Sequence, residues 1–190
     1  ERTGPIHRVD DVRIRLPLAA FLLTGAAFQT QGPMVLGAAD PLISHATFHD
    51  FFPPEDGLRW SGSRSEVVFK EPGAFIPVRV ELLLSGWRPP GEPPAELTLR
   101  AGATAVTVQL GPGAQTVSLE TITPGIWSSD LVLTLQSSTF DPGPADARKL
   151  GVRVEEARLV PLGRGPRVPP LRPLVLGVAL AILIVFILGQ

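Results

Sequence analysis

The last apolar stretch of the chain, residues 174–189, most strongly constrains what the chain can fold into. It reads LVLGVALAILIVFILG and contains no charged or amide side chain. Twelve of its sixteen residues are Leu, Ile, Val or Phe, and together these favour transfer into a bilayer by about 4–7 kcal/mol. As an α-helix the stretch rises about 24 Å, against the roughly 30 Å of hydrocarbon that a span crosses. Because no polar stripe interrupts it, as one would in a surface helix of a soluble domain, we predict a transmembrane helix over residues 174–189.

A second apolar run lies near the beginning of the chain, after a polar arm of mixed charge at residues 1–15. Residues 16–28 (LPLAAFLLTGAAF) have the length of a signal-peptide core, but the arm before them carries acidic residues as well as arginines. Extended to residue 38, the run is long enough for a membrane helix that tolerates two glutamines at interfacial depth or against a partner helix. We predict such a helix over residues 16–38. The alternative is an arm and a first strand packed on the domain.

The composition of the 190 residues narrows the class of protein. The net charge is −1, from 17 Lys and Arg against 18 Asp and Glu, so no global field attracts nucleic acid. The chain has no cysteine, which excludes disulfides, zinc thiolate sites and thiol nucleophiles. It has 21 prolines and 19 glycines without a G-X-Y period, which favours a β-rich domain with many turns.

Residues 40–162, between the two apolar runs, alternate apolar and polar side chains with a period of two. The clearest example is VRVELLL at residues 78–84, and the pattern recurs at residues 97–99, 106–110, 117–119, 131–135 and 152–154. Turn sequences such as RPPGEPP at 88–94 and DPGP at 141–144 separate these segments. Period two places the apolar side chains on one face of each strand. We predict an all-β fold, a two-sheet antiparallel sandwich of jelly-roll or immunoglobulin-like type with about seven to nine strands.

Residues 163–173 connect this sandwich to the last apolar stretch. Their sequence, GRGPRVPPLRP, contains four prolines, which lack the amide donors that a helix interior or a central strand requires. We predict a semi-rigid stalk. Arginines precede both apolar runs, so the positive-inside rule does not by itself decide on which side of a membrane the sandwich lies.

Two motifs resemble those of a known group of proteins. The first is FFPPED at 51–56 followed by LRWSG at 58–62, and the second is FDPGPADARKLGVRV at 140–154. Both are similar to bacterial jelly-roll domains that lie between membrane spans in glycosyltransferase-like membrane proteins and in membrane proteins of unknown function. The matching positions are Pro53, Pro54, Glu55, Arg59, Trp60, Asp146, Arg148, Leu150, Gly151 and Val152, whereas Ala147 replaces a proline of the pattern.

This resemblance covers about residues 35 to 189. It implies a carbohydrate-binding-like jelly roll on the extracytoplasmic side of a membrane. It does not extend to the multi-span catalytic part of such glycosyltransferases, and it therefore implies no transferase activity.

Four charged residues of the two motifs form a candidate structural clasp. Glu55 and Asp146 are acids that can accept bidentate hydrogen bonds from the guanidinium groups of Arg59 and Arg148. We predict that these pairs form a clasp between the two ends of the sandwich. A ligand site is the alternative interpretation.

The sequence contains no pattern that supports a catalytic or metal-binding site. His45 and His49 would lie about 13 Å apart on a strand, which is too far for one metal ion. No Gly-x-Ser-x-Gly elbow, phosphate loop or dinucleotide fingerprint occurs in the sequence. Neighbouring carboxylates such as Glu155 and Glu156 face opposite ways on a strand. We therefore predict no enzyme activity, no catalytic residues, no metal and no cofactor.

Three tryptophans, Trp60, Trp87 and Trp127, are candidates for a sugar-stacking surface. Aromatic side chains usually fill the interior of a sandwich, so core packing is the competing interpretation. Trp87 and Trp127 border loops rich in Pro and Gly, where a ligand-binding aromatic residue is expected. Contact of these loops with lipid headgroups is a third interpretation.

These observations together predict a membrane-anchored, extracytoplasmic sandwich that binds or scaffolds and does not catalyse. The predicted role is an accessory subunit of a membrane protein assembly, with the lipid bilayer and other membrane subunits as partners. The alternative is a carbohydrate-binding module that belongs to a membrane glycosyltransferase system and binds a glycan.

Overall fold

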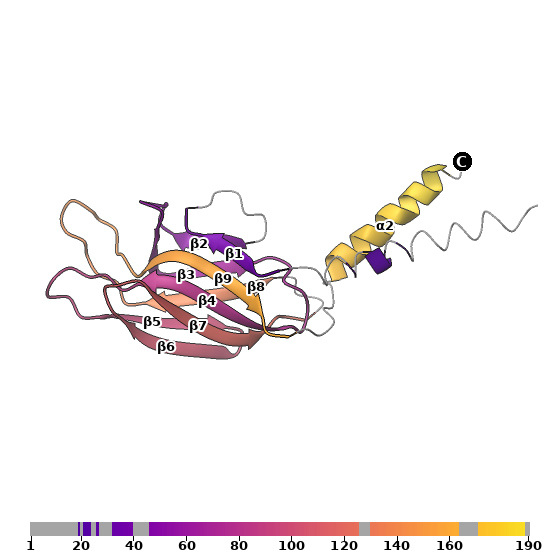
Figure 1. Ribbon diagram of the computed structural model, residues 1–190. Helices are drawn as coiled ribbons and strands as arrows, with labels where there is room; N and C mark the ends of the chain where they lie inside the picture. The colour runs from indigo at the N-terminus through magenta and orange to yellow at the C-terminus, as the bar shows by residue number, and fades with distance from the viewer. Residues whose placement is uncertain are drawn as a thin grey trace, which may run out of the picture.

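The computed structural model describes residues 19, 21–23, 26, 32–39, 46–125, 130–163 and 171–188. These residues form antiparallel strands followed by a helix (Figure 1). The strands are β1 (Met34–Gly37), β2 (Ala46–Phe51), β3 (Arg59–Phe69), β4 (Pro77–Ser85), β5 (Ala95–Ala101), β6 (Thr104–Leu110), β7 (Gln115–Ile122), β8 (Leu131–Ser137) and β9 (Arg153–Pro161), and the helix is α2 (Leu171–Leu188). The nine strands agree with the predicted number.

The strands pair as two antiparallel layers that share β3. One layer has the order β2-β3-β8-β5-β6, and in the other β9 and β4 pair with each other while β1 and β7 pair on their outer sides. The carboxyl half of β3 pairs with β8, whereas Arg59 and Trp60 at its beginning pair with β9. Ser65 stabilises the intervening bend, because its hydroxyl donates to the carbonyl of Asp50 and accepts from the amide of Gly62. The predicted two-sheet antiparallel sandwich is confirmed.

The core lies between the two layers and follows the period of two in the sequence. In β4, Val78, Val80, Leu82 and Leu84 are buried, and the charged residues between them lie at the surface. The facing layer contributes alternating residues of β5 and β8, including Leu97, Leu99, Leu131, Leu133 and Leu135. This burial is the main source of stability of the sandwich.

The two ends of the sandwich differ, and we name them by their position relative to α2. At the proximal end, from which the chain continues to α2, β9 ends at Pro161, β7 ends at Ile122 and β4 begins at Pro77 (Figure 1). At the distal end, β4 finishes and β3 and β9 begin, with Arg153 paired to both Trp60 and Ser85. A side chain near a strand terminus therefore belongs to one end or the other.

The predicted first membrane helix is wrong at its carboxyl end. Met34–Gly37 forms strand β1, which pairs with β9, and Leu36 is buried in the core. The alternative prediction, a first strand packed on the domain, describes this segment. The physical reason is that residues 34–37 gain backbone hydrogen bonds along β9 and bury Leu36. Residues 19, 21–23 and 26 are helical, whereas the predicted arm at residues 1–15 lies outside the described residues.

α2 covers most of the predicted carboxyl-terminal span and includes Leu171 to Pro173 of the predicted stalk. Pro173 lies in the first turn of α2, where its missing amide hydrogen costs no helical hydrogen bond. Within the described part of the chain, we find no helix with both the length and the apolar character needed to cross a membrane. The spans predicted at residues 16–38 and 174–189 are therefore not supported as membrane-crossing helices.

Candidate functional site

Three aromatic rings from separate segments meet at the distal end of the sandwich. Trp60 lies on β3, Trp87 follows the end of β4, and Phe140 pairs with Leu150 in an isolated bridge. The ring centroids are 6.2 Å apart for Trp60 and Trp87, 5.8 Å for Trp60 and Phe140, and 5.9 Å for Trp87 and Phe140, all with edge-to-face geometry. We call these three residues the distal aromatic cluster.

The members of the distal aromatic cluster differ in exposure. Trp60 is 9% exposed and Phe140 is 4% exposed, so both are parts of a small core. Trp87 is 40% exposed and borders the Pro-rich loop at residues 88–94. Two buried rings therefore fix the position of one indole that solvent reaches.

Two arginines lie against the distal aromatic cluster. The guanidinium of Arg88 lies 4.7 Å from the centroid of Phe140, and it donates to the carbonyl of Gly151 and, at 2.6 Å, to that of Ser138. Burial lowers the pKa of Arg88 from its ordinary value, while the nearby charge of Glu92 acts in the opposite direction. The guanidinium of Arg153 lies 5.5 Å from the ring centroid of Trp60, and its buried Nε has no hydrogen-bond partner among the described residues.

Two serine hydroxyls, of which that of Ser61 is buried, support the backbone near these arginines. The Oγ of Ser61 accepts from the amide of Val152 at 2.9 Å, and the Oγ of Ser137 donates to the carbonyl of Gly62 at 3.0 Å. A Cβ at Gly151 would overlap both hydroxyls and the Gly62 carbonyl. Glycine at position 151 therefore allows the close approach that places its carbonyl within reach of Arg88.

Three of the four residues of the predicted clasp meet at the distal end. The guanidinium of Arg148 donates to the Asp146 carboxylate at 2.6 and 2.9 Å and to Oε1 of Glu55 at 2.5 Å. It also lies 5.4 Å from the ring centroid of Phe52. These contacts join the segment before β3 to the loop before β9. Both segments lie at the distal end, so the clasp does not connect the two ends of the sandwich as predicted.

The charges of the clasp shift two pKa values. Hydrogen bonding to Asp146, and then to Glu55, raises the pKa of Arg148 above its ordinary value. Hydrogen bonds from the Arg148 side chain and amide lower the pKa of Asp146 below its ordinary value. Both groups are therefore held in their charged forms at neutral pH.

Arg59 does not join this clasp. Its Nε donates to the carbonyl of Ala38 at 2.6 Å, and its guanidinium lies 5.3 Å from the ring centroid of Phe48. Arg59 thus connects β3 to the turn after β1. Arg59 was predicted to pair with an acid because Glu55 is close to it in the sequence. The sequence does not show in which direction the side chain of Arg59 leaves the strand.

The three predicted tryptophans do not form one described surface. Trp60 and Trp87 are in contact, whereas Trp127 lies outside the described residues. The sequence analysis missed Arg88, Ser61 and Ser137. The available signals were the Trp-Arg pair before a proline-rich loop and the serine within the LRWSG part of the first motif.

The chemistry available at the distal end is that of recognition. It presents an exposed indole, the exposed side chains of Ser138 and Glu92, and guanidinium groups held by carbonyl or carboxylate oxygens. Within the described residues, no group of three or more His, Cys, Asp or Glu side chains is arranged to hold a metal ion.

No protein-family model matches the chain, and no curated protein matches it. Solved structures with similar arrangements include the carbohydrate-binding module CBM6 of LamC from Zobellia galactanivorans, at 12% identity over 67% of this chain and 98% of that chain, with a TM-score of 0.39. A family 35 carbohydrate-binding module from Clostridium thermocellum has 7% identity over 68% and 98%, with a TM-score of 0.43. The Cry4Aa toxin from Bacillus thuringiensis has 11% identity over 69% and 24%, with a TM-score of 0.44. Because these TM-scores are below 0.5, the likenesses do not assign a ligand to this chain.

Proposed function

We propose that this chain is a non-catalytic recognition module, attached to a lipid bilayer through α2, whose distal end binds a glycan on the extracytoplasmic side. The observation that carries the proposal is the exposure of Trp87 on a support of two buried aromatic rings. A sugar ring presents a face of C–H groups that can stack on an indole. Since Trp60 and Phe140 already hold the indole, stacking costs little side-chain entropy.

Polar groups around Trp87 complement a stacked sugar. Glu92 is exposed in the loop that follows Trp87, and Ser138 is exposed next to Arg88, which donates to the carbonyls of Ser138 and Gly151. An apolar platform with a few fixed polar groups is the usual composition of a small-molecule site.

The surface of α2 supports attachment to a bilayer. Its large apolar side chains are between 40% and 66% exposed at Val175, Leu176, Leu180, Ile182, Leu183, Ile184, Phe186 and Ile187. An apolar surface of this extent is unfavourable in water and marks a membrane or protein contact. After Glu156 the sequence contains Arg158, Arg164, Arg167 and Arg172 and no acidic residue, which favours contact with anionic lipid.

Binding of the full chain to a glycan array tests the recognition role. Trp87→Ala is expected to abolish the glycan signal because it removes the exposed ring, whereas Trp87→Phe retains part of it. Phe75→Ala is the matched control, because Phe75 is an exposed aromatic residue at the other end of the sandwich. A glycan signal that survives Trp87→Ala, or the absence of any glycan signal for the unmodified chain, contradicts this role.

Flotation of the full chain with phosphatidylcholine and phosphatidylglycerol vesicles tests the attachment. Leu180 is 59% exposed on α2, and a lysine there places a charge in the apolar surface that contacts the bilayer, so Leu180→Lys is expected to weaken vesicle binding. Val35→Lys is the control, since Val35 is an exposed apolar residue of the sandwich. Attachment through α2 is wrong if the two variants float equally well.

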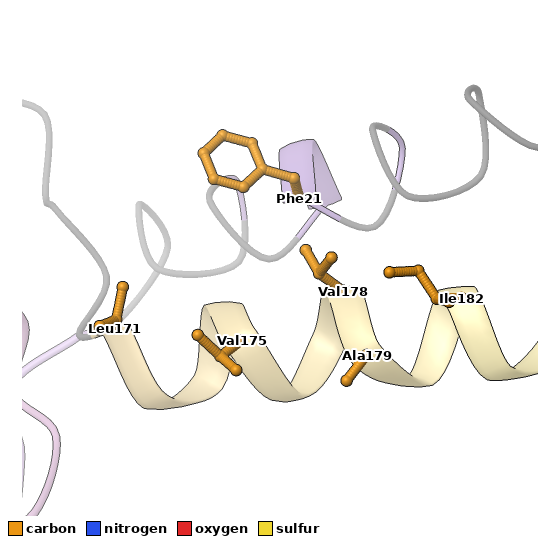
Figure 2. Close-up of a pocket in the computed structure, with 6 residues that line it drawn as sticks. All are labelled: Phe21, Leu171, Val175, Val178, Ala179 and Ile182. Atoms are coloured by element: carbon orange, nitrogen blue, oxygen red, sulfur yellow. The ribbon is translucent and has the colours of Figure 1, made fainter.

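A second candidate function is that of an accessory subunit in a membrane protein assembly. The observation in its favour is an open apolar groove of about 400 Å³ between α2 and the segment that carries Phe21 (Figure 2). Its lining is formed by Phe21, Leu171, Val175, Val178, Ala179 and Ile182. Because this lining is apolar, apolar side chains of a partner helix would fit into the groove. If a subunit copurifies from native membranes and Ala179→Trp removes it, the accessory role is supported, and otherwise it is not.

A further inference from the structure

We infer that the proximal end of the sandwich is a second lipid-contacting surface, which inserts apolar side chains among the headgroups of an anionic bilayer. This inference rests on the proposed attachment of α2 to the bilayer. It adds that the sandwich itself touches the membrane in a fixed orientation, with its distal aromatic cluster pointing away.

Three exposed apolar residues from separate segments come together at the proximal end. Phe75 is 64% exposed, Ile122 is 63% exposed and Leu162 is 41% exposed. Pro77 connects them, since it pairs with Ile122 and its carbonyl accepts from the amide of Leu162. The amide of Phe75 donates to the carbonyl of Pro124, just beyond Ile122. We call Phe75, Ile122 and Leu162 the proximal apolar group.

The backbone of Phe75 holds its side chain in this exposed position. Its φ is +56°, in the left-handed region that bulky residues rarely occupy. The ring lies against Gly125, where a Cβ would approach the Phe75 Cζ to 2.9 Å. Ile76, the next residue, is buried, and its amide donates to the buried hydroxyl of Thr123 at 2.8 Å. Strain at an exposed aromatic residue indicates a constraint other than core packing.

Chain length places the proximal end near the point where α2 meets the bilayer. β9 ends at Pro161 and α2 begins at Leu171. At about 3.5 Å for each extended residue, the connection at residues 162–170 reaches about 30 Å at most. The nine residues of β4, at about 3.3 Å each, carry the distal end about 30 Å further away. The proximal end is therefore nearer than the distal end, along the chain, to the point where α2 meets the surface.

The charges near this end complement an anionic surface. Lys70 is exposed just after β3, and Arg172 is exposed at the beginning of α2. The acids beside Lys70, Glu71 and Asp130, are half-buried, and the Asp130 carboxylate accepts from the amide of Glu71. The sequence between β9 and α2 adds Arg164 and Arg167 without an acidic residue. Basic side chains next to apolar ones are the combination that binds the interface of an anionic membrane. This charge pattern selects a lipid surface as the occupant of the proximal apolar group.

The absence of cysteine from the sequence allows a direct test. Ile122→Cys in the full chain is labelled with an environment-sensitive fluorophore and bound to phosphatidylcholine and phosphatidylglycerol vesicles that contain nitroxide-labelled lipid. Glu92→Cys, which is exposed at the distal end, is the matched control. We expect lipid nitroxide to quench the probe at position 122 several-fold more than the probe at position 92, and its emission to shift to the blue.

Equal quenching at both positions, with the chain bound to the vesicles, overturns this inference and leaves the attachment of α2 intact. Failure of the chain to float with vesicles instead overturns the proposed attachment. A blue shift at position 122 without lipid quenching, which weakens when the protein is diluted in the membrane, indicates a second copy and also overturns the inference. As a further variant, Phe75→Gly removes a ring and relieves the positive φ, so it is expected to fold and to reduce quenching at position 122.

Discussion

Both ends of the sandwich carry large apolar residues, but these residues differ in their exposure to solvent. At the distal end, Trp60 and Phe140 are buried against each other and Arg148 closes the surface by ion pairs. At the proximal end, Phe75 and Ile122 remain exposed next to the connection to α2. The difference teaches that the aromatic rings of the distal end pack on one another and hold the exposed Trp87 in place, whereas Phe75 and Ile122 at the proximal end do not form such a cluster and offer their apolar surface to partners outside the chain.

The largest expected effect is on the stability of the distal end. Trp60→Ala removes the centre of the aromatic cluster and is expected to lower the free energy of unfolding by about 3–5 kcal/mol. Phe75→Ala, a change of an exposed aromatic residue at the proximal end, is expected to change it by no more than about 0.5 kcal/mol. Chemical denaturation of the full chain in detergent measures both. Similar losses for the two variants would remove the contrast between the ends.

A smaller effect is expected where both ends depend on a buried hydroxyl. Ser61 accepts from the amide of Val152 at the distal end, and Thr123 accepts from the amide of Ile76 at the proximal end. Ser61→Ala and Thr123→Val each leave a buried amide without its partner, which costs about 1–3 kcal/mol. The same denaturation experiment applies, with the exposed Ser118→Ala as control. If only one of the two variants lowers the free energy of unfolding, the two ends do not depend on their buried hydroxyls in the same way.

The clasp is expected to contribute less, because its groups are partly exposed and salt screens them. Arg148→Ala is expected to lower the free energy of unfolding at neutral pH, and the loss shrinks at high salt. Since Arg148 lowers the pKa of Asp146, its stabilising effect is present above the ordinary value of 3.8 and is lost as the pH falls below it. The unmodified chain and Arg148→Ala are therefore expected to have more similar free energies of unfolding as the pH falls, which chemical denaturation across this pH range measures. If the difference between the two proteins is undiminished when Asp146→Asn is introduced into both, the clasp does not act through the charge of Asp146.

The smallest effect on stability is expected at the proximal surface. Ile122→Gln is expected to change the free energy of unfolding by no more than about 0.5 kcal/mol, because the side chain packs against little of the domain. We expect the Ile122→Gln variant to bind anionic vesicles more weakly and to bind glycans as well as the unmodified chain does. Vesicle flotation and glycan-array binding of the same preparation measure the two properties. A change in both would mean that the ends are not independent.

Much of the distal site was predictable from two motifs, but its geometry was not. Glu55, Asp146 and Arg148 were expected to pair, and the structure brings them together. Arg59 was given the same role and instead binds the carbonyl of Ala38. The roles of Arg88 and Ser61 could not be predicted from the sequence, because their partners are backbone atoms of residues 151 and 152, which are distant in the sequence. Local patterns do not show which carbonyl a long side chain reaches.

The sequence by itself determined the antiparallel sandwich, because period two in burial follows directly from the geometry of a strand with one buried face. It also determined the apolar character of α2, which depends only on composition. Tertiary structure alone decided that Met34–Gly37 is a strand and that Trp60 and Trp87 meet at the end opposite to Phe75 and Ile122. The physical reason is that strand order and register depend on pairings between residues far apart in the chain, and these pairings determine which loops share an end.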